Sequence, residues 1–91
     1  MGSIYEIVFA KSVKSYYDSC NDEIKNQFRN AIEEIRINPY GINNFKIKKM
    51  RGTLKNNYRY RFSDYRIVYS IDKNKIIVSV SDFGPRGDVY K

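Results

Sequence analysis

The chain has 91 residues, with 17 lysines and arginines against 10 aspartates and glutamates, and a formal net charge of +7. Hydrophobic residues make up 42% and charged residues 30%, a globular composition that excludes a disordered or membrane-embedded chain. With one cysteine and no histidine, an internal disulfide and histidine-based catalysis are excluded, and we expect no metal site and no cofactor.

Length and charge also indicate where the protein works and what it binds. A chain of this size predicts one domain over residues 1–91. No apolar run approaches the roughly 20 residues of a membrane helix, and Met1-Gly2-Ser3 does not begin a secretory signal. Together with the single thiol, this predicts a cytoplasmic protein without a membrane partner. The positive charge favours a polyanion such as nucleic acid or an acidic protein, although solubility alone would also explain it.

The N-terminal half predicts a strand and two helices. Ile4–Phe9 is a β-branched and aromatic run that predicts a strand. A first helix is expected from Lys11 to about Ser19, and Asn21 is a typical N-cap for a second. Pro39 ends the second helix, because the residue before a proline is pushed out of the helical region. The apolar stripe of this second helix is Ile24, Phe28, Ala31, Ile32 and Ile35.

The C-terminal half predicts a cation-rich irregular stretch followed by strands. The stretch reaches from Pro39 to Asn57, and its cations are Lys46, Lys48, Lys49, Arg51 and Lys55. Strands are expected at Tyr58–Phe62, Tyr65–Ile71 and Ile76–Ser81, with Phe83–Lys91 as an ordered tail or a short final strand. The order β-α-α-β-β-β predicts an α+β fold, in which a two-helix hairpin packs on a twisted, mostly antiparallel sheet.

The hairpin of the first two C-terminal strands has a predictable register. If Ser63-Asp64 is a two-residue turn, Arg61 faces Arg66 and Arg59 faces Val68. Three arginines, Arg59, Arg61 and Arg66, then share the face opposite the core. The expected core face carries Tyr58, Tyr60, Phe62, Tyr65, Ile67, Tyr69 and Ile71.

Directly opposed like charges destabilise a sheet, so the Arg61–Arg66 pair needs an explanation. A phosphate held by several guanidinium groups would make the cluster favourable. The alternative is a solvated basic face that carboxylates reach from elsewhere, with Asp64 at the turn as the nearest candidate. The pattern favours the anion site, because no carboxylate interrupts the arginine stripe.

The second half of the chain contains four motifs in order. They are Met50-Arg51-Gly52, Tyr58-Arg59-Tyr60-Arg61, Asp64-Tyr65-Arg66-Ile67-Val68-Tyr69 and Gly84-Pro85-Arg86-Gly87-Asp88-Val89-Tyr90. Their order and spacing resemble the RelE/ParE toxin superfamily, and its RelE branch in particular. The resemblance implies the toxin of a type II toxin–antitoxin system, a ribosome-dependent endoribonuclease that cleaves mRNA and inhibits translation. It also implies a small, partly acidic antitoxin as partner.

The resemblance further implies roles for individual residues in a metal-free attack by the RNA 2′-hydroxyl. Arg59 and Arg61 match the family's two strand cations, and Arg66 matches the arginine that contacts the scissile phosphate. Arg86 matches the tail arginine that stabilises phosphate or leaving group, and Tyr90 matches the tail tyrosine near the attacking hydroxyl. The cations Lys46, Lys48, Lys49, Arg51 and Lys55 would contact RNA phosphates.

Two alternatives remain open. A ParE-like inhibitor of DNA gyrase would cleave nothing, and a non-catalytic nucleic-acid-binding module would keep only the fold and the charge. Pro85 and Gly87, which replace basic family positions, keep the second alternative open. Among the remaining aromatic residues, we expect Tyr16, Tyr17, Phe28 and Phe45 to pack in the core or against the helices and not to stack on bases.

Overall fold

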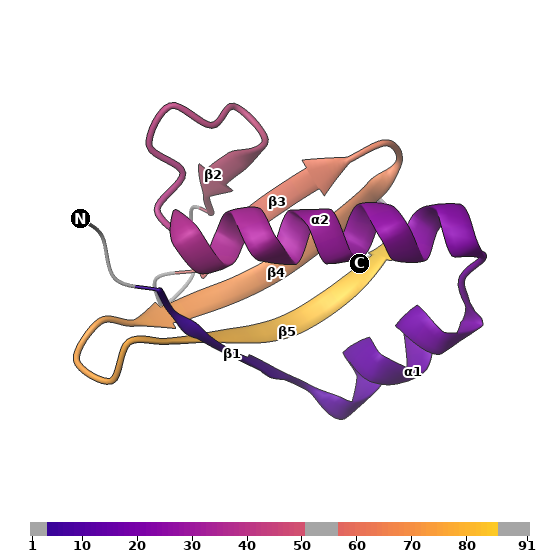
Figure 1. Ribbon diagram of the computed structural model, residues 1–91, viewed down its shortest axis with the longest axis horizontal. Helices are drawn as coiled ribbons and strands as arrows, with labels where there is room; N and C mark the ends of the chain where they lie inside the picture. The colour runs from indigo at the N-terminus through magenta and orange to yellow at the C-terminus, as the bar shows by residue number, and fades with distance from the viewer. Residues whose placement is uncertain (1–3, 51–56, 86–91) are drawn as a thin grey trace.

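The computed structural model describes residues 4–50 and 57–85, where two helices cover one face of a five-stranded sheet (Figure 1). The strand order is β1-β5-β4-β3-β2, with β1 parallel to β5 and the other pairs antiparallel. This confirms the expected α+β class. The elements are β1 (Glu6–Phe9), α1 (Lys11–Ser19), α2 (Asp22–Ile37), β2 (Ile47–Lys49), β3 (Asn57–Phe62), β4 (Tyr65–Asp72) and β5 (Ile77–Pro85).

Both helices follow the sequence signals closely. The Asn21 side chain accepts a hydrogen bond of 2.9 Å from the backbone N–H of Ile24, and this caps α2. Asp22 and Glu23 in the first turn and Arg36 in the last turn complement the helix dipole. Neither helix in the described ranges is long and apolar enough to cross a lipid bilayer.

The β3–β4 hairpin has the predicted register at every pair. Phe62 lies opposite Tyr65, so Ser63-Asp64 forms the two-residue turn, and Arg61 lies opposite Arg66. Ser63 adopts a φ of 50°, the left-handed conformation that such tight hairpin turns require. The alternation of the two strands is therefore fixed by the turn.

Two expectations for the strands were incomplete. The stretch expected to be irregular contains β2, a short edge strand in which Ile47 pairs with Tyr60. The last strand does not end at Ser81 but continues to Pro85, with a register shift opposite Val68 and Tyr69. β2 was missed because pairing with β3, and not its own lysine-rich sequence, makes it a strand.

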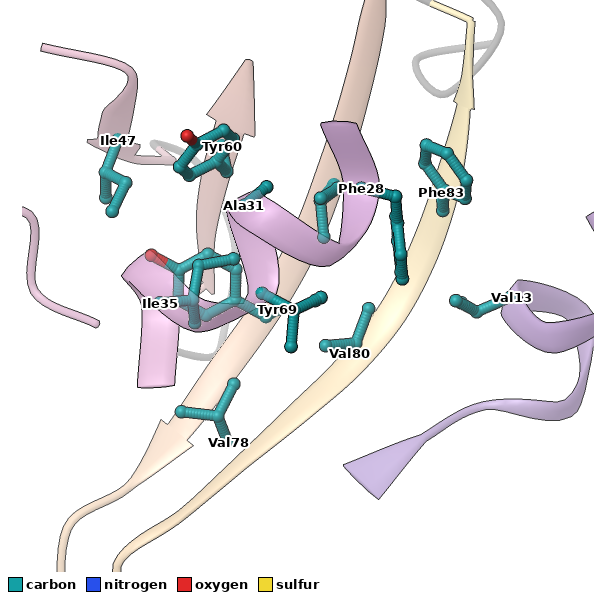
Figure 2. Close-up of a cluster of buried hydrophobic side chains, with 12 residues drawn as sticks. Val13, Phe28, Ala31, Ile35, Ile47, Tyr60, Tyr69, Val78, Val80 and Phe83 are labelled. Carbon is teal, nitrogen blue, oxygen red and sulfur yellow. The ribbon is translucent and has the colours of Figure 1, made fainter. Parts of the chain in front are cut away.

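The core lies between the helices and one face of the sheet (Figure 2). The side chains of Tyr60, Tyr69 and Val80 point from the sheet toward Ile35 of α2, and all four are buried. The expected stripe of α2 is confirmed, since its buried residues are Phe28, Ala31, Ile32 and Ile35. The side chains that alternate with these sheet residues are consequently directed to the opposite face.

Candidate nucleic-acid interface

Arg59, Arg61 and Arg66 lie together on the sheet face that points away from the helices, which we call the arginine face. Arg59 and Arg61 flank the buried Tyr60 on β3, so strand alternation directs them away from α2. Arg66 lies directly opposite Arg61 on β4. The structure thus brings together the three strand arginines that the sequence selected.

Burial distinguishes Arg66 from an ordinary surface arginine. It is the one charged residue among the buried residues described, with only 3% of its surface exposed. Its Nε and Nη1 atoms and the Nε atom of Arg61 are inaccessible to solvent. Arg66 is therefore not a solvated side chain. In such a site the lower local dielectric strengthens the attraction between a guanidinium and an anion.

The described lysines of the cation-rich stretch divide between the two faces of the sheet. Lys48 pairs with Arg59 across β2 and β3, so it extends the arginine face. Lys49 pairs with Tyr58 and is on the opposite side by alternation. Lys46 also lies toward the helices, where its Nζ atom is 3.7 Å from a carboxylate oxygen of Glu34. Only Lys48, among these three, lies with the arginines.

A carboxylate that the sequence reasoning did not place there also lies on the arginine face. Asp82 of β5 pairs with Val68, and Arg66 pairs with Gly84 two residues further along β5. Asp82 is therefore a diagonal neighbour of Arg66. The expected strand ended before Asp82, and the register shift that reverses the alternation of β5 has no simple sequence signal. Asp64, the carboxylate expected nearest the cluster, is exposed at the turn.

Tyr60 and Tyr69 lie on the helix side and are unsuited to proton transfer at the arginine face. Burial raises the pKa of Tyr60 well above its ordinary value, and the hydrogen bond of 2.7 Å that it donates to Glu34 raises it further. Burial likewise raises the pKa of Tyr69, whose hydroxyl donates to the Pro39 carbonyl at 2.7 Å. Both phenols therefore keep their protons and act as structural hydrogen-bond donors.

Four predicted site residues lie outside the described residues. They are Arg51, Lys55, Arg86 and Tyr90. Their roles stay predictions, as do the catalytic and RNA-binding roles of the residues described above.

A second surface feature is a groove of about 540 Å³ in the helix layer. Apolar side chains of β1, α1 and α2 line it, Phe9, Val13 and Ile32 among them, together with charged groups of both signs, such as Lys14 and Glu33. Three of the lining side chains are basic and two are acidic, so the groove does not single out a polyanion. Its apolar lining is instead typical of a surface that binds another protein segment.

Comparisons with known proteins agree with this geometry. A family model described as "ParE toxin of type II toxin-antitoxin system, parDE" matches residues 7–90. Comparison with curated protein sequences gives no match.

Several solved structures share the fold. RelE in the RelE–RelB complex of Pyrococcus horikoshii is 25% identical, with a TM-score of 0.79 over 92% of this chain and 97% of that one. The isolated Escherichia coli RelE toxin is 23% identical, with a TM-score of 0.76 over 94% and 90% of the two chains. The YoeB dimer of Staphylococcus aureus gives 19% identity and a TM-score of 0.71 over 88% and 94%.

Proposed function

The chain belongs to the ParE toxin family of type II toxin–antitoxin systems, within the RelE/ParE superfamily, and from this premise we propose that it is a cytoplasmic endoribonuclease that cleaves messenger RNA on the ribosome. The observation that carries the proposal is the Arg61–Arg66 pair. Two like charges directly opposite each other weaken a sheet, and one of them is buried. A phosphate bound between the two guanidinium groups would interact favourably with both.

The proposed reaction is a transesterification within the RNA. The 2′-hydroxyl oxygen attacks the adjacent phosphorus, the bond to the 5′-oxygen breaks, and the products are a cyclic phosphate and a 5′-hydroxyl. The proton of the attacking hydroxyl leaves as the departing oxygen gains one. Negative charge increases on the phosphoryl oxygens in the transition state, and Arg61 and Arg66 supply preorganised positive charge at that point.

Proton transfer is the weaker part of this chemistry. Arginine keeps its proton under all ordinary conditions, so the three arginines stabilise charge and do not act as acids or bases. Lys48 adds an ammonium group beside Arg59, and Tyr90 is the position that the family resemblance assigns near the 2′-hydroxyl. A site with so little acid–base power depends on the ribosome to orient the RNA, since orientation alone lowers a barrier by several kcal/mol.

We further propose that a cognate antitoxin inhibits the protein. Solved structures of similar chains include RelE in complex with RelB from Pyrococcus horikoshii and Escherichia coli. The net charge of +7 favours an acidic segment of that partner. Growth after induction, with and without the neighbouring gene, tests this part of the proposal.

The site is tested by the substitutions Arg66→Ala and Arg86→Ala in single-turnover cleavage of a programmed ribosome. Loss of one preorganised donor costs about 2.7–4 kcal/mol, which is a hundred- to thousandfold in rate. Ribosome binding should change far less, because it is distributed over many phosphate contacts. Arg29→Ala, which removes an equal charge from the exposed side of α2, is the matched control. Cleavage at the parental rate by both variants would refute the site.

The family match to ParE favours one second candidate, inhibition of DNA gyrase. Sequencing of RNA ends and measurement of the DNA-damage response, in the same cells, separate the two functions. Cuts in register with translating ribosomes support the ribonuclease, whereas DNA damage with intact messenger RNA supports the gyrase inhibitor. If neither is observed, the protein is a non-catalytic binding module.

A further inference from the structure

Phe45 is the most exposed large apolar side chain described, with 94% of its surface accessible. The expectation that it packs in the core is therefore wrong. It lies in the segment between α2 and β2, immediately before Lys46. Isolated exposed apolar residues are common on proteins, so the question is whether the molecule holds this ring outward in a defined position.

The backbone on both sides of Phe45 is fixed by hydrogen bonds. The side chain of Asn44 donates to Glu34 at 2.9 Å and accepts from the backbone N–H of Lys46 at 3.0 Å. The carbonyl of Asn44 accepts from the N–H of Ile47 at 3.2 Å. The backbone of Phe45 is thus held between two anchored residues, which fixes the point from which its exposed ring projects.

The conformation of the segment before Phe45 is also specified. Gly41 has a φ of 72°, and a Cβ atom at this position would lie 2.6 Å from the Cγ2 atom of Ile47. Glycine is therefore required by both conformation and space. The side chain of Asn38 forms two hydrogen bonds with the backbone of Ile42, at 2.8 and 3.2 Å. These features indicate a defined loop and not a passive linker.

The backbone at Phe45 lies next to the end of β3 that carries Arg61. The backbone N–H of Arg61 donates to the carbonyl of Lys46 at 2.9 Å. Phe45 therefore directly precedes a residue that is hydrogen-bonded to β3. Lys48, on the same edge strand, extends the arginine face beside Arg59. An exposed aromatic ring next to several cations is the combination with which proteins bind single-stranded nucleic acid, the ring for a base and the cations for phosphates.

We propose that Phe45 is a stacking platform for an unpaired RNA base, whose neighbouring phosphate is held at the Arg61 and Lys48 end of the arginine face. This inference rests on the proposed function for the identity of the nucleic acid. It assigns a base-binding position outside the scissile phosphate site. Charge complementarity favours RNA over an apolar protein segment, because a nucleotide satisfies the ring and the adjacent cations at the same time.

The test uses the full chain and two single-stranded probes that it cannot cleave. One is a 2′-O-methyl RNA oligonucleotide, and the other has the same backbone without bases, so both carry the same charge. Phe45→Ala should weaken binding of the first probe roughly 5- to 140-fold, the factor that corresponds to the loss of one stacked base. Binding of the second probe should not change. Phe45→Trp should bind the first probe as tightly as the parental chain, because it keeps an aromatic ring. Ile42 is an exposed residue of the same loop, and Ile42→Ala should also bind like the parental chain.

Three results would overturn the inference. The first is parental affinity of Phe45→Ala for the base-bearing probe, and the second is an equal loss on both probes. The third is an effect of Phe45→Ala confined to self-association or to antitoxin binding, measured by sedimentation. A thermal melt checks that the variant is folded. Cleavage is not part of this readout. If Phe45→Ala keeps the parental affinity for the base-bearing probe while the parental chain cleaves RNA on the ribosome, the stacking site alone is refuted. If Phe45→Ala loses that affinity but the parental chain does not cleave, the proposed reaction alone is refuted.

Discussion

The two faces of the β3–β4 hairpin are made by alternate residues of the same two strands, yet they follow different physical rules. On the helix side, Tyr60, Ile67 and Tyr69 are buried against apolar neighbours. On the other side, Arg61 lies opposite Arg66, and the pair opposes the stability of the sheet. The residues of one face are explained by burial in the core, whereas the arginines of the other suit the binding of an anion.

This difference shows how function can be placed in a small fold. A sheet residue that points away from the core contributes little to stability, so its identity can be set by a ligand. Arg66 and Val68 are nevertheless buried on that face. The one buried charge among the described residues thus lies where a phosphate is expected.

The largest effect is predicted for the helix side. Ile35 is fully buried between α2 and the sheet, and Ile35→Ala should lower the free energy of unfolding by about 2–5 kcal/mol, measured by urea denaturation. Ile37→Ala, at an exposed position two residues later, is the matched control and should change it by less than about 0.5 kcal/mol. Equal losses in the two variants would show that the core is not where the structure places it.

A substitution on the arginine face is predicted to change the free energy of unfolding by less, and in the opposite direction. Arg61→Thr removes one of two opposed charges and keeps a residue that favours strands, so the free energy of unfolding should stay unchanged or rise by up to about 1 kcal/mol. Cleavage of a programmed ribosome by the same variant should fall. A clear loss of stability would identify Arg61 as a structural residue and would remove the contrast between the faces.

The smallest predicted effect is on the salt dependence of RNA binding, and it distinguishes two adjacent lysines on opposite faces of the sheet. Lys48 extends the arginine face, whereas Lys49 pairs with Tyr58 and is directed to the other side. Lys48→Ala should remove one phosphate contact and reduce the slope of log affinity against log salt by about 0.7 on single-stranded RNA. Lys49→Ala should leave the slope unchanged. The same reduction in both variants would mean that RNA wraps around the edge strand.

Much of the fold and part of the site follow from sequence because they depend on local signals. The cap at Asn21 and the apolar stripe of α2 predict that helix, and the turn at Ser63 fixes the pairing of Arg61 with Arg66. A two-residue turn leaves one register only, so the arginine face could be predicted residue by residue.

The features that were missed depend on tertiary contacts. β2 exists because β3 offers it a pairing partner, and Asp82 reaches the arginine face through a register shift. Phe45 is a residue type that usually lies in the core. Hydrogen bonds of Asn44 on one side and of Lys46 on the other hold the backbone of Phe45 at the surface. Residue type predicts burial only where the backbone path is already known.

The parallel pairing of β1 with β5 also has a consequence for how the protein is made. Glu6 pairs with Ile77, so the strand that is synthesised first among the described elements cannot be completed in the sheet until β5 has been made. α1 also packs against β5 and must wait with it. Closing so long a segment of chain is entropically costly and slow compared with forming the β3–β4 hairpin. The β3–β4 hairpin, which carries the arginines, is therefore expected to form before β1 and α1 close onto β5.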